Sequence, residues 1–276
     1  MDLEKRYQSI AASISDGSLS FPTSVGNALK IQQILDDPDC ALDQAARLIQ
    51  GEPLLAARVV ATANSVAYNR SGREITDLRT AVSRLGFRTL RSLTMAVLTR
   101  QMAGNPSGET QKLIGQLWTH TAYVAAIAHL LARRVTHVDP EAALFAGVVH
   151  EVGGFYLLSL ASQSPELIGD DHLPWLEGGE ALIGRAVLEK IGVPANILEA
   201  IAGYWEGYLA IPPVSLADTL LLAKQLAPVP SPLRQPETSE APALSAQIDM
   251  IVGEDMLSSI LQDAHEEVSS LMQALQ

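Results

Sequence analysis

The sequence predicts an all-α fold. Hydrophobic residues make up 47% of its 276 residues while aromatic residues make up only 5%, and its abundant Ala and Leu suit packed helices better than sheets. Apolar residues also recur at steps of three and four in short segments separated by brief polar breaks, which is the spacing of amphipathic helices. A chain of this length can bury one large core or two modest ones.

Short helices are predicted throughout the first hundred residues. Capping residues such as Asp77 precede their starts, and glycines such as Gly51 and Gly86 mark their ends. Asn64 interrupts one apolar run; it is suited to the left-handed position at a helix end, and we interpret it as structural rather than as a ligand. The predicted helices span residues 3–14, 24–35 (capped at 23 or 24), 39 or 42 to 49, 54–63, 77–85 and 87–102.

The clearest internal break lies at residues 103–109, which hold two glycines, an asparagine and a proline. We take it as the boundary between an N-terminal helical array, residues 1–103, and a second helical bundle, residues 104–227. Asp139, followed by Pro140, is a predicted N-cap in this bundle, and His172 falls in a loose polar connection where we expect it to be exposed. The predicted helices of the bundle begin near residues 117, 140, 179, 194 and 215.

A proline-rich linker is predicted at residues 228–242, because five prolines in fifteen residues prevent a helix and favour an extended spacer. The tail, residues 243–276, then restarts as an amphipathic helix whose apolar stripe must be buried. Packing against the same chain is the default, and a homodimer through this helix is the alternative. The stripe consists of Leu257, Ile260, Leu261, Ala264, Val268, Leu271 and Leu275, and His265 lies off it, where we expect it to face solvent.

Two histidines stand where apolar residues are expected in the bundle. His120 lies on the inward stripe of its helix, together with Val124. His150 and Glu151 fall in the last turn of a short apolar helix, which the pair Gly153–Gly154 is predicted to end. An inward histidine facing a His-carboxylate pair is one way to build a metal site.

Structural interpretations of the same residues stay open. A lone inward histidine is more often a hydrogen-bonded core residue than a ligand, and a histidine at a helix C-terminus is favoured there by the helix dipole. Asp218 lies on an apolar helix beside Leu221 and Leu222. A buried carboxylate needs a partner, and we expect that partner to be His120 or a metal ion.

Five segments resemble, in the same order, the HDOD domain, a subfamily of the HD phosphohydrolase superfamily. The order His120, then His150 with its neighbouring acid, then Asp218 resembles the superfamily's minimal site of His, His-Asp and Asp. The matching segments are FPTSVGNALKIQQILDDPD (21–39), ARLIQGEPLLAARVVATANSVAYN (46–69), AVSRLGFRTLRSL (81–93), LWTHT (117–121) and FAGVVHEVG (145–153). The resemblance implies a multihelical HDOD fold, with the helical array packed on a degenerate HD-type bundle.

The departures from the HD pattern imply a vestigial metal site. Glu151 stands where the superfamily has Asp, and Glu180 stands where many HDOD members carry a further His. The aromatic pair Tyr204–Trp205 replaces a His-His pair. Metal catalysis needs tightly held ligands and an open coordination position. We therefore predict no catalytic residue. The vestigial metal ligands that the resemblance implies are His120, His150, Glu151 and Asp218.

Charge and composition limit the partners. A formal charge of −12 argues against unaided binding to DNA, RNA or an anionic membrane. The single cysteine, Cys40, excludes an internal disulfide framework, and we expect it to be buried and unreactive. The first residues carry no apolar signal run, and no stretch reaches the unbroken apolar length of a membrane helix. We expect a soluble cytoplasmic protein.

The one local basic cluster lies at residues 79–100. A solvated helix face with intramolecular ion pairs is the favoured interpretation, and a site for a carboxylate-rich or phosphorylated partner is the alternative. The cluster consists of Arg79, Arg84, Arg88, Arg91 and Arg100.

Two functions follow from these observations. The favoured one is a bacterial signal-transduction protein without catalysis or cofactor, which binds a small signalling ligand or a partner protein such as a signalling kinase, a receiver or a cyclic-nucleotide pathway component. The alternative is a single-metal phosphohydrolase that uses Mn, Fe, Zn or Mg at the four implied ligands, acting on a phosphoester or nucleotide. Without a metal, we expect His120 and Asp218 to form a buried polar pair.

Overall fold

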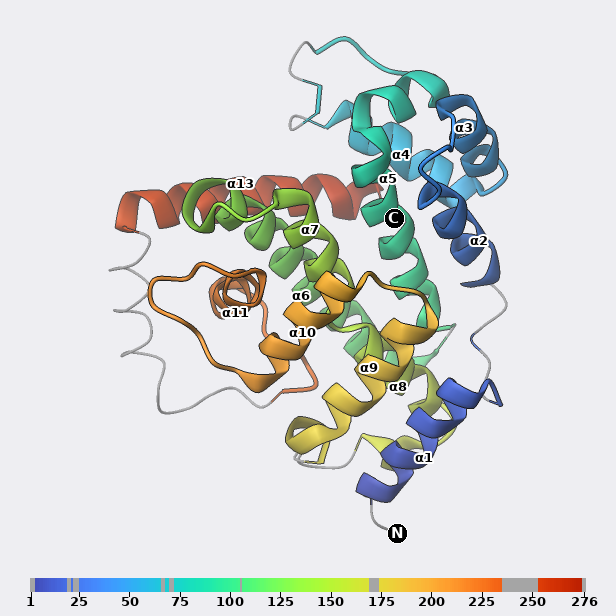
Figure 1. Ribbon diagram of the computed structural model, residues 1–276, viewed down its shortest axis with the longest axis vertical. Coiled ribbons are helices and arrows are strands. Elements are labelled where there is room, and N and C mark those ends of the chain that lie inside the picture. The colour runs from blue at the N-terminus through green and yellow to red at the C-terminus, as the bar shows by residue number, and fades with distance from the viewer. Residues whose placement is uncertain are drawn as a thin grey trace.

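The computed structural model describes residues 3–18, 21, 25–65, 68–69, 72–104, 106–168, 174–234 and 253–274. All its regular elements are helices, and no strand occurs in these ranges, so the predicted all-α class is confirmed (Figure 1). The predicted cap at 23–24, His172, residues 235–252 of the linker and tail, and Leu275 lie outside the described residues.

The N-terminal helices follow the predicted breaks. Asp77 caps α5 as predicted, because its Oδ1 accepts a hydrogen bond of 2.8 Å from the Thr80 amide. Gly86, with φ 73° and ψ 168°, interrupts α5 where the sequence predicts a stop; glycine tolerates this left-handed φ at low cost. The helices are α1 (Leu3–Asp16), α2 (Val25–Leu35), α3 (Leu42–Gln50), α4 (Pro53–Asn64) and α5 (Leu78–Met102).

In the second group of helices the predicted cap Asp139 is confirmed, and α11 begins close to the predicted position. Asp139 Oδ1 accepts hydrogen bonds from the amides of Glu141 and Ala142 at the start of α7, and Ser215 caps α11. The elements are α6 (Gly108–Leu131), η1 (Ala132–Thr136), α7 (Pro140–Val149), α8 (Val152–Ala161), η2 (Pro165–Leu167), η3 (Trp175–Gly179), α9 (Glu180–Lys190), α10 (Ala195–Glu206), α11 (Leu216–Leu226) and α13 (Glu254–Ala274).

Two apolar cores hold the chain together. The smaller core lies among α2, α3, α4 and one side of α5, up to Val97. The larger core includes α6 to α11, and it also takes in Tyr7, Ala11 and Ile14 of α1, because α1 packs against α9 (Figure 1). Leu98 and Met102 of α5 belong to it too. The larger core therefore extends across the predicted boundary at residue 103, since it includes residues of α1 and of the end of α5.

Asn64 has the structural role that the sequence indicates. Its Oδ1 accepts a hydrogen bond of 2.8 Å from the Ile75 amide, and its Nδ2 donates one of 2.7 Å to the Ile75 carbonyl. It therefore ties the end of α4 to the segment that leads into α5. The left-handed conformation suggested for Asn64 is wrong, since His137 is the non-glycine residue with positive φ in the described ranges.

The basic cluster is a face of intramolecular pairs, as the favoured interpretation predicts. Arg79 pairs with Asp43 at 2.6 Å and Arg88 with Asp139 at 2.8 Å. Arg91 pairs with Asp36 and also donates to the Leu35 carbonyl, while Arg84 donates to the Tyr68 carbonyl. Arg100 also has an interaction partner. Cys40 is buried, and burial raises the pKa of its thiol, which agrees with an unreactive residue.

The C-terminal helix α13 packs along α6 and reaches α4 (Figure 1). Its stripe residues Ile260, Ala264 and Val268 are buried in the larger core. His265 is exposed, but its Nδ1 lies 2.9 Å from the Tyr123 hydroxyl. The described stripe is thus covered within one chain.

The segment Pro140–Ala161 is long and apolar enough to cross a membrane, but 83% of its most apolar window is buried. It forms α7 and α8, in the middle of the larger core. This segment is therefore the interior of a helical protein.

Candidate metal centre

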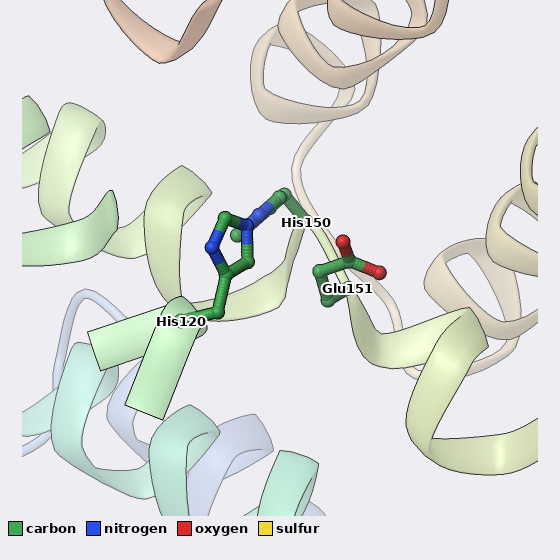
Figure 2. Close-up of side chains that lie close together, drawn as sticks. All are labelled: His120, His150 and Glu151. Atoms are coloured by element: carbon green, nitrogen blue, oxygen red, sulfur yellow. The ribbon is translucent and has the colours of Figure 1, made fainter. Parts of the chain in front are cut away.

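Three predicted metal ligands meet in the larger core. His120 comes from α6, while His150 and Glu151 come from the turn between α7 and α8 (Figure 2). Each of the three is only 1% exposed. One ligand atom from each lies within 4.8 Å of the other two, so a single ion could contact all three.

A close helix contact brings the two histidines together. A Cβ atom on Gly147 of α7 would lie 2.5 Å from the Cα and 3.0 Å from the amide nitrogen of Ala125 on α6. Only a glycine allows this approach without a shift of the backbone. Since His150 follows Gly147 by three residues, and His120 precedes Ala125 by five, the contact sets the distance between their rings, whose centroids are 5.7 Å apart.

The pair Gly153–Gly154 does not end a helix, which corrects the prediction. Both residues lie inside α8, which begins at Val152. A Cβ atom on Gly153 would lie 2.7 Å from the Cα of Gly184 on α9, so this glycine serves close helix packing. The chain instead turns at His150 and Glu151, and this turn places the His150 ring next to that of His120, with the Glu151 side chain close by (Figure 2).

Backbone carbonyls fix the orientation of both imidazoles. The Nδ1 of His120 lies 2.7 Å from the Val229 carbonyl, and that of His150 lies 2.7 Å from the Gly147 carbonyl. Since a carbonyl only accepts, both Nδ1 atoms carry the proton, and each Nε2 presents a lone pair. Among the described residues, neither Nε2 nor either oxygen of Glu151 makes a hydrogen bond of normal geometry, although the Ser231 hydroxyl lies near the Glu151 carboxylate. Four buried acceptors that lack a well-formed hydrogen bond fit a bound cation.

Burial also keeps the histidines neutral. It lowers the pKa of His150 to about 4 and lowers the pKa of His120 in the same direction, because an imidazolium loses its hydration in the core. Burial alone raises the pKa of Glu151, but the histidines in their protonated forms, Arg234 and a hydrogen bond from Ser231 hold it below its ordinary value. Neutral imidazoles and a charged carboxylate are the forms that ligate a metal.

Asp218 does not join this group. Its Oδ2 accepts hydrogen bonds from the amides of Val214 and Ser215 and from the Ser215 hydroxyl, at 3.1, 2.9 and 2.6 Å. Its Oδ1 accepts a bond of 2.9 Å from the Ala210 amide. Asp218 thus completes the capping box of α11, and the predicted pair with His120 is not formed. The sequence carried the signal for this role, a serine three residues before the acid.

A second group of polar residues lies beside the three ligands. Glu180 is buried at the start of α9, and its Oε2 pairs with Arg234 Nη2 at 2.5 Å. The guanidinium carbon of Arg234 lies 5.6 Å from the centre of the Tyr204 ring, which meets His150 edge-on at 5.3 Å. Trp205 faces elsewhere, since its ring packs on Gly184.

The segment that supplies Arg234 is not predicted from the sequence to contact this site. We call residues 228–234 the strap, because they return from the end of α11 across the centre. Val229 contacts His120, Ser231 and Leu233 are buried, and Arg234 reaches Glu180. The prolines led to the prediction of a spacer, although the Leu233–Arg234 pair between them was a signal that this stretch has contacts of its own.

The sequence pattern of the HDOD domain matches residues 21–206. The chain belongs to the HDOD domain family. Solved structures share the fold over almost the whole chain. A candidate metal-dependent phosphohydrolase from Shewanella amazonensis SB2B has a TM-score of 0.73 and 23% identity, covering 98% of this chain and 100% of its own.

Two other structures have this fold. An HDOD domain protein of unknown function from Geobacter sulfurreducens has a TM-score of 0.65 and 22% identity, covering 98% of this chain and 97% of its own. A candidate signal transduction protein from Marinobacter aquaeolei VT8 has a TM-score of 0.68 and 19% identity, covering 100% of this chain and 67% of its own. An uncharacterized protein of Treponema pallidum is 21% identical over 212 residues, and the match covers 73% of this chain and 40% of that protein.

Proposed function

We propose that this HDOD protein is a regulatory protein that acts by binding a partner and does not hydrolyse phosphoesters. The observation that carries the proposal is Asp218, whose two oxygens are used by four hydrogen bonds at the start of α11. Three of the four implied ligands therefore remain, and Glu151 replaces the shorter Asp. Metal-assisted hydrolysis needs an open position for water and substrate, whereas all three remaining ligands are 99% buried.

The partner that fits this proposal is another protein of a bacterial signalling system, such as a kinase, a receiver or a cyclic-nucleotide pathway component. The name of the Marinobacter structure, a candidate signal transduction protein, supports this class. The charge of −12 disfavours nucleic acid and anionic lipid as partners. We place the protein in the cytoplasm, since its apolar segment is used as a core.

A second function, single-metal phosphohydrolase, is favoured by the Nε2 atoms and carboxylate oxygens that lack a well-formed hydrogen bond. His120, His150 and Glu151 would hold the ion, and two imidazoles with one carboxylate suit Mn, Fe or Zn. When bound, such an ion supplies an activated water for attack on a phosphoester. The residues themselves orient the ligands through the Val229 and Gly147 carbonyls and exclude bulk water.

Two measurements test the proposed function. The purified protein is loaded with Mn, Fe or Zn, its metal content is determined, and hydrolysis of a generic phosphodiester is compared with the His150→Ala variant. We expect no hydrolysis above that of the variant, whether or not metal is bound. Metal-dependent turnover that His150→Ala abolishes would replace the first function by the second.

A deletion strain of the organism that carries the gene gives the positive test. Because the proposal assigns function to binding, His150→Ala is expected to restore the regulatory phenotype as well as the unaltered gene does, provided that the variant folds. Failure of a folded His150→Ala protein to restore it would contradict the proposal.

A further inference from the structure

The strap closes the centre from one side. Its Val229 carbonyl binds His120, and its Leu233 side chain packs at Gly154, where a Cβ atom would lie 2.8 Å from Leu233 Cδ1 and 3.1 Å from Glu151 Oε2. Leu233 is only 1% exposed. The strap therefore covers the carboxylate of Glu151 and holds one histidine in place.

Beside the three ligands, Glu180 and Tyr204 form a second polar position. Glu180 Oε1 and the Tyr204 hydroxyl are buried, and Arg234 is a charged side chain that interacts with both residues. The guanidinium of Arg234 enters this position, where it pairs with Glu180 Oε2 and lies against the face of the Tyr204 ring.

The charges explain why a cation is needed there. Burial and the neighbouring charge of Glu151 raise the pKa of Glu180 to about 7, against the opposite effect of Arg234 and Lys224. Two buried carboxylates that repel each other are costly unless positive charge compensates them. Arg234 supplies one unit of that charge and remains partly exposed along its side chain.

We propose that Glu180, Glu151 and Tyr204 form a second cation position, and that Arg234 fills it as an internal counter-cation in place of a divalent metal ion. The inference deepens the proposed function, on which it rests, by giving the regulatory protein a centre that its own strap keeps closed. Withdrawal of the strap exposes Glu151, frees Glu180 and lets a hard divalent cation such as Mn²⁺ bind to the carboxylate oxygens.

The test compares the thermal unfolding of the full-length protein and its Arg234→Ala variant, with and without Mn²⁺. A cation that binds only the folded state raises the unfolding temperature. We expect saturating Mn²⁺ to raise that of Arg234→Ala by about 5 °C more than that of the unaltered protein. The Arg234→Ala/Glu180→Gln double variant is expected to lose this extra rise, because it lacks the carboxylate that Arg234 pairs with.

Arg185→Ala is the matched control. Arg185 also lies against an aromatic ring beside α10, with its guanidinium carbon 5.8 Å from the centre of Trp205, but it is exposed and does not pair with Glu180. Its response to Mn²⁺ is expected to equal that of the unaltered protein. An equal response of Arg234→Ala and the unaltered protein, or an extra rise that persists without the Glu180 carboxylate, would overturn the proposal.

Arg234→Gln covers the case in which Arg234→Ala does not fold. A glutamine keeps a long polar side chain beside Glu180 but removes the positive charge, so we expect an extra rise with Mn²⁺ similar to that of Arg234→Ala; no extra rise in a folded Arg234→Gln protein would count against the proposal. Hydrolysis by the unaltered protein would contradict the proposed function without changing these unfolding temperatures. The two failures are therefore distinguishable.

Discussion

Asp218 and Arg234 illustrate how single residues were assigned from sequence. Asp218 looked like a ligand because the family pattern places an acid there, yet a serine three residues earlier is an equally specific capping signal. The capping interaction uses all its acceptor atoms. Arg234 was missed because its contact with Glu180 spans 54 residues of sequence, and no local pattern encodes such a contact.

Asp218→Ala is predicted to destabilise the protein by about 0.5–2 kcal/mol, because it removes the capping box of α11 and leaves the amides of Ala210, Val214 and Ser215 without this acceptor. Chemical denaturation measures the loss. Asp218→Asn, which keeps the size of the side chain but points an amide at some of these donors, should recover only part of it. Metal content should be unaffected by Asp218→Ala; a loss of metal equal to that of His150→Ala would show that Asp218 is a ligand after all.

The same substitution has a predictable pH dependence. Burial raises the pKa of Asp218, but hydrogen bonds from Ser215, Ala210 and Val214 outweigh it and hold the pKa below its ordinary value. A depressed native pKa means that the stabilisation is complete above the unfolded pKa of about 3.9 and is lost as the pH falls through the native value. The stability difference between Asp218→Ala and the unaltered protein should therefore close in acid, below about pH 4. A difference that stays constant down to pH 2 would contradict this.

At the level of elements, the ends of helices could be predicted from the sequence, but the contacts between helices could not. Asp77 and Asp139 cap helices as their sequence positions predict, and α11 begins close to the predicted residue 215. The Gly153–Gly154 pair was misinterpreted, because a glycine that allows close packing and a glycine that ends a helix look the same in sequence. Which of the two it is depends on the neighbour, here Gly184.

Gly147→Ala is predicted to destabilise the protein by about 1–3 kcal/mol, since the added methyl overlaps the backbone of Ala125 and forces α7 away from α6. The same displacement moves His150 away from His120, so any bound metal should be held less tightly. Thermal unfolding and metal content measure the two effects.

Gly115→Ala is the control on the neighbouring helix. Nothing lies within 4 Å of a Cβ atom at this position of α6, and alanine favours a helix over glycine by up to about 1 kcal/mol. We expect neutral or slightly raised stability and unchanged metal content. Equal losses in both variants would mean that the contact between Gly147 and Ala125 is unimportant.

For the whole molecule, the fold class and the helical tail followed from composition and periodicity, but the partition into cores did not. The sequence places α1 beside the N-terminal array, while the structure packs it on α9, far along the chain. Amphipathic periodicity indicates that one face of a helix is buried, but it does not indicate which other helix covers that face.

Removal of residues 253–276 is predicted to lower the unfolding temperature, because it uncovers the faces of α6 and α4 against which α13 packs. Light scattering on the two forms addresses the alternative of a homodimer. Because Ile260, Ala264 and Val268 are already buried in one chain, we expect the full-length protein to remain a monomer. A dimer that disappears with the tail would indicate that copies exchange α13.

The helix α5 contributes to both cores, and this limits where the gene can be divided into separately expressed parts. Its Leu90, Leu93 and Val97 belong to the smaller core, while its Met95, Leu98 and Met102 belong to the larger one. Gly104 is the obvious place to cut the chain into two fragments for expression. Such a cut would expose the apolar side chains Met95, Leu98 and Met102 on the first fragment and the core surface that they cover on the second. We expect each fragment to aggregate when it is expressed alone. Co-expression of the two fragments should allow them to associate and stay soluble.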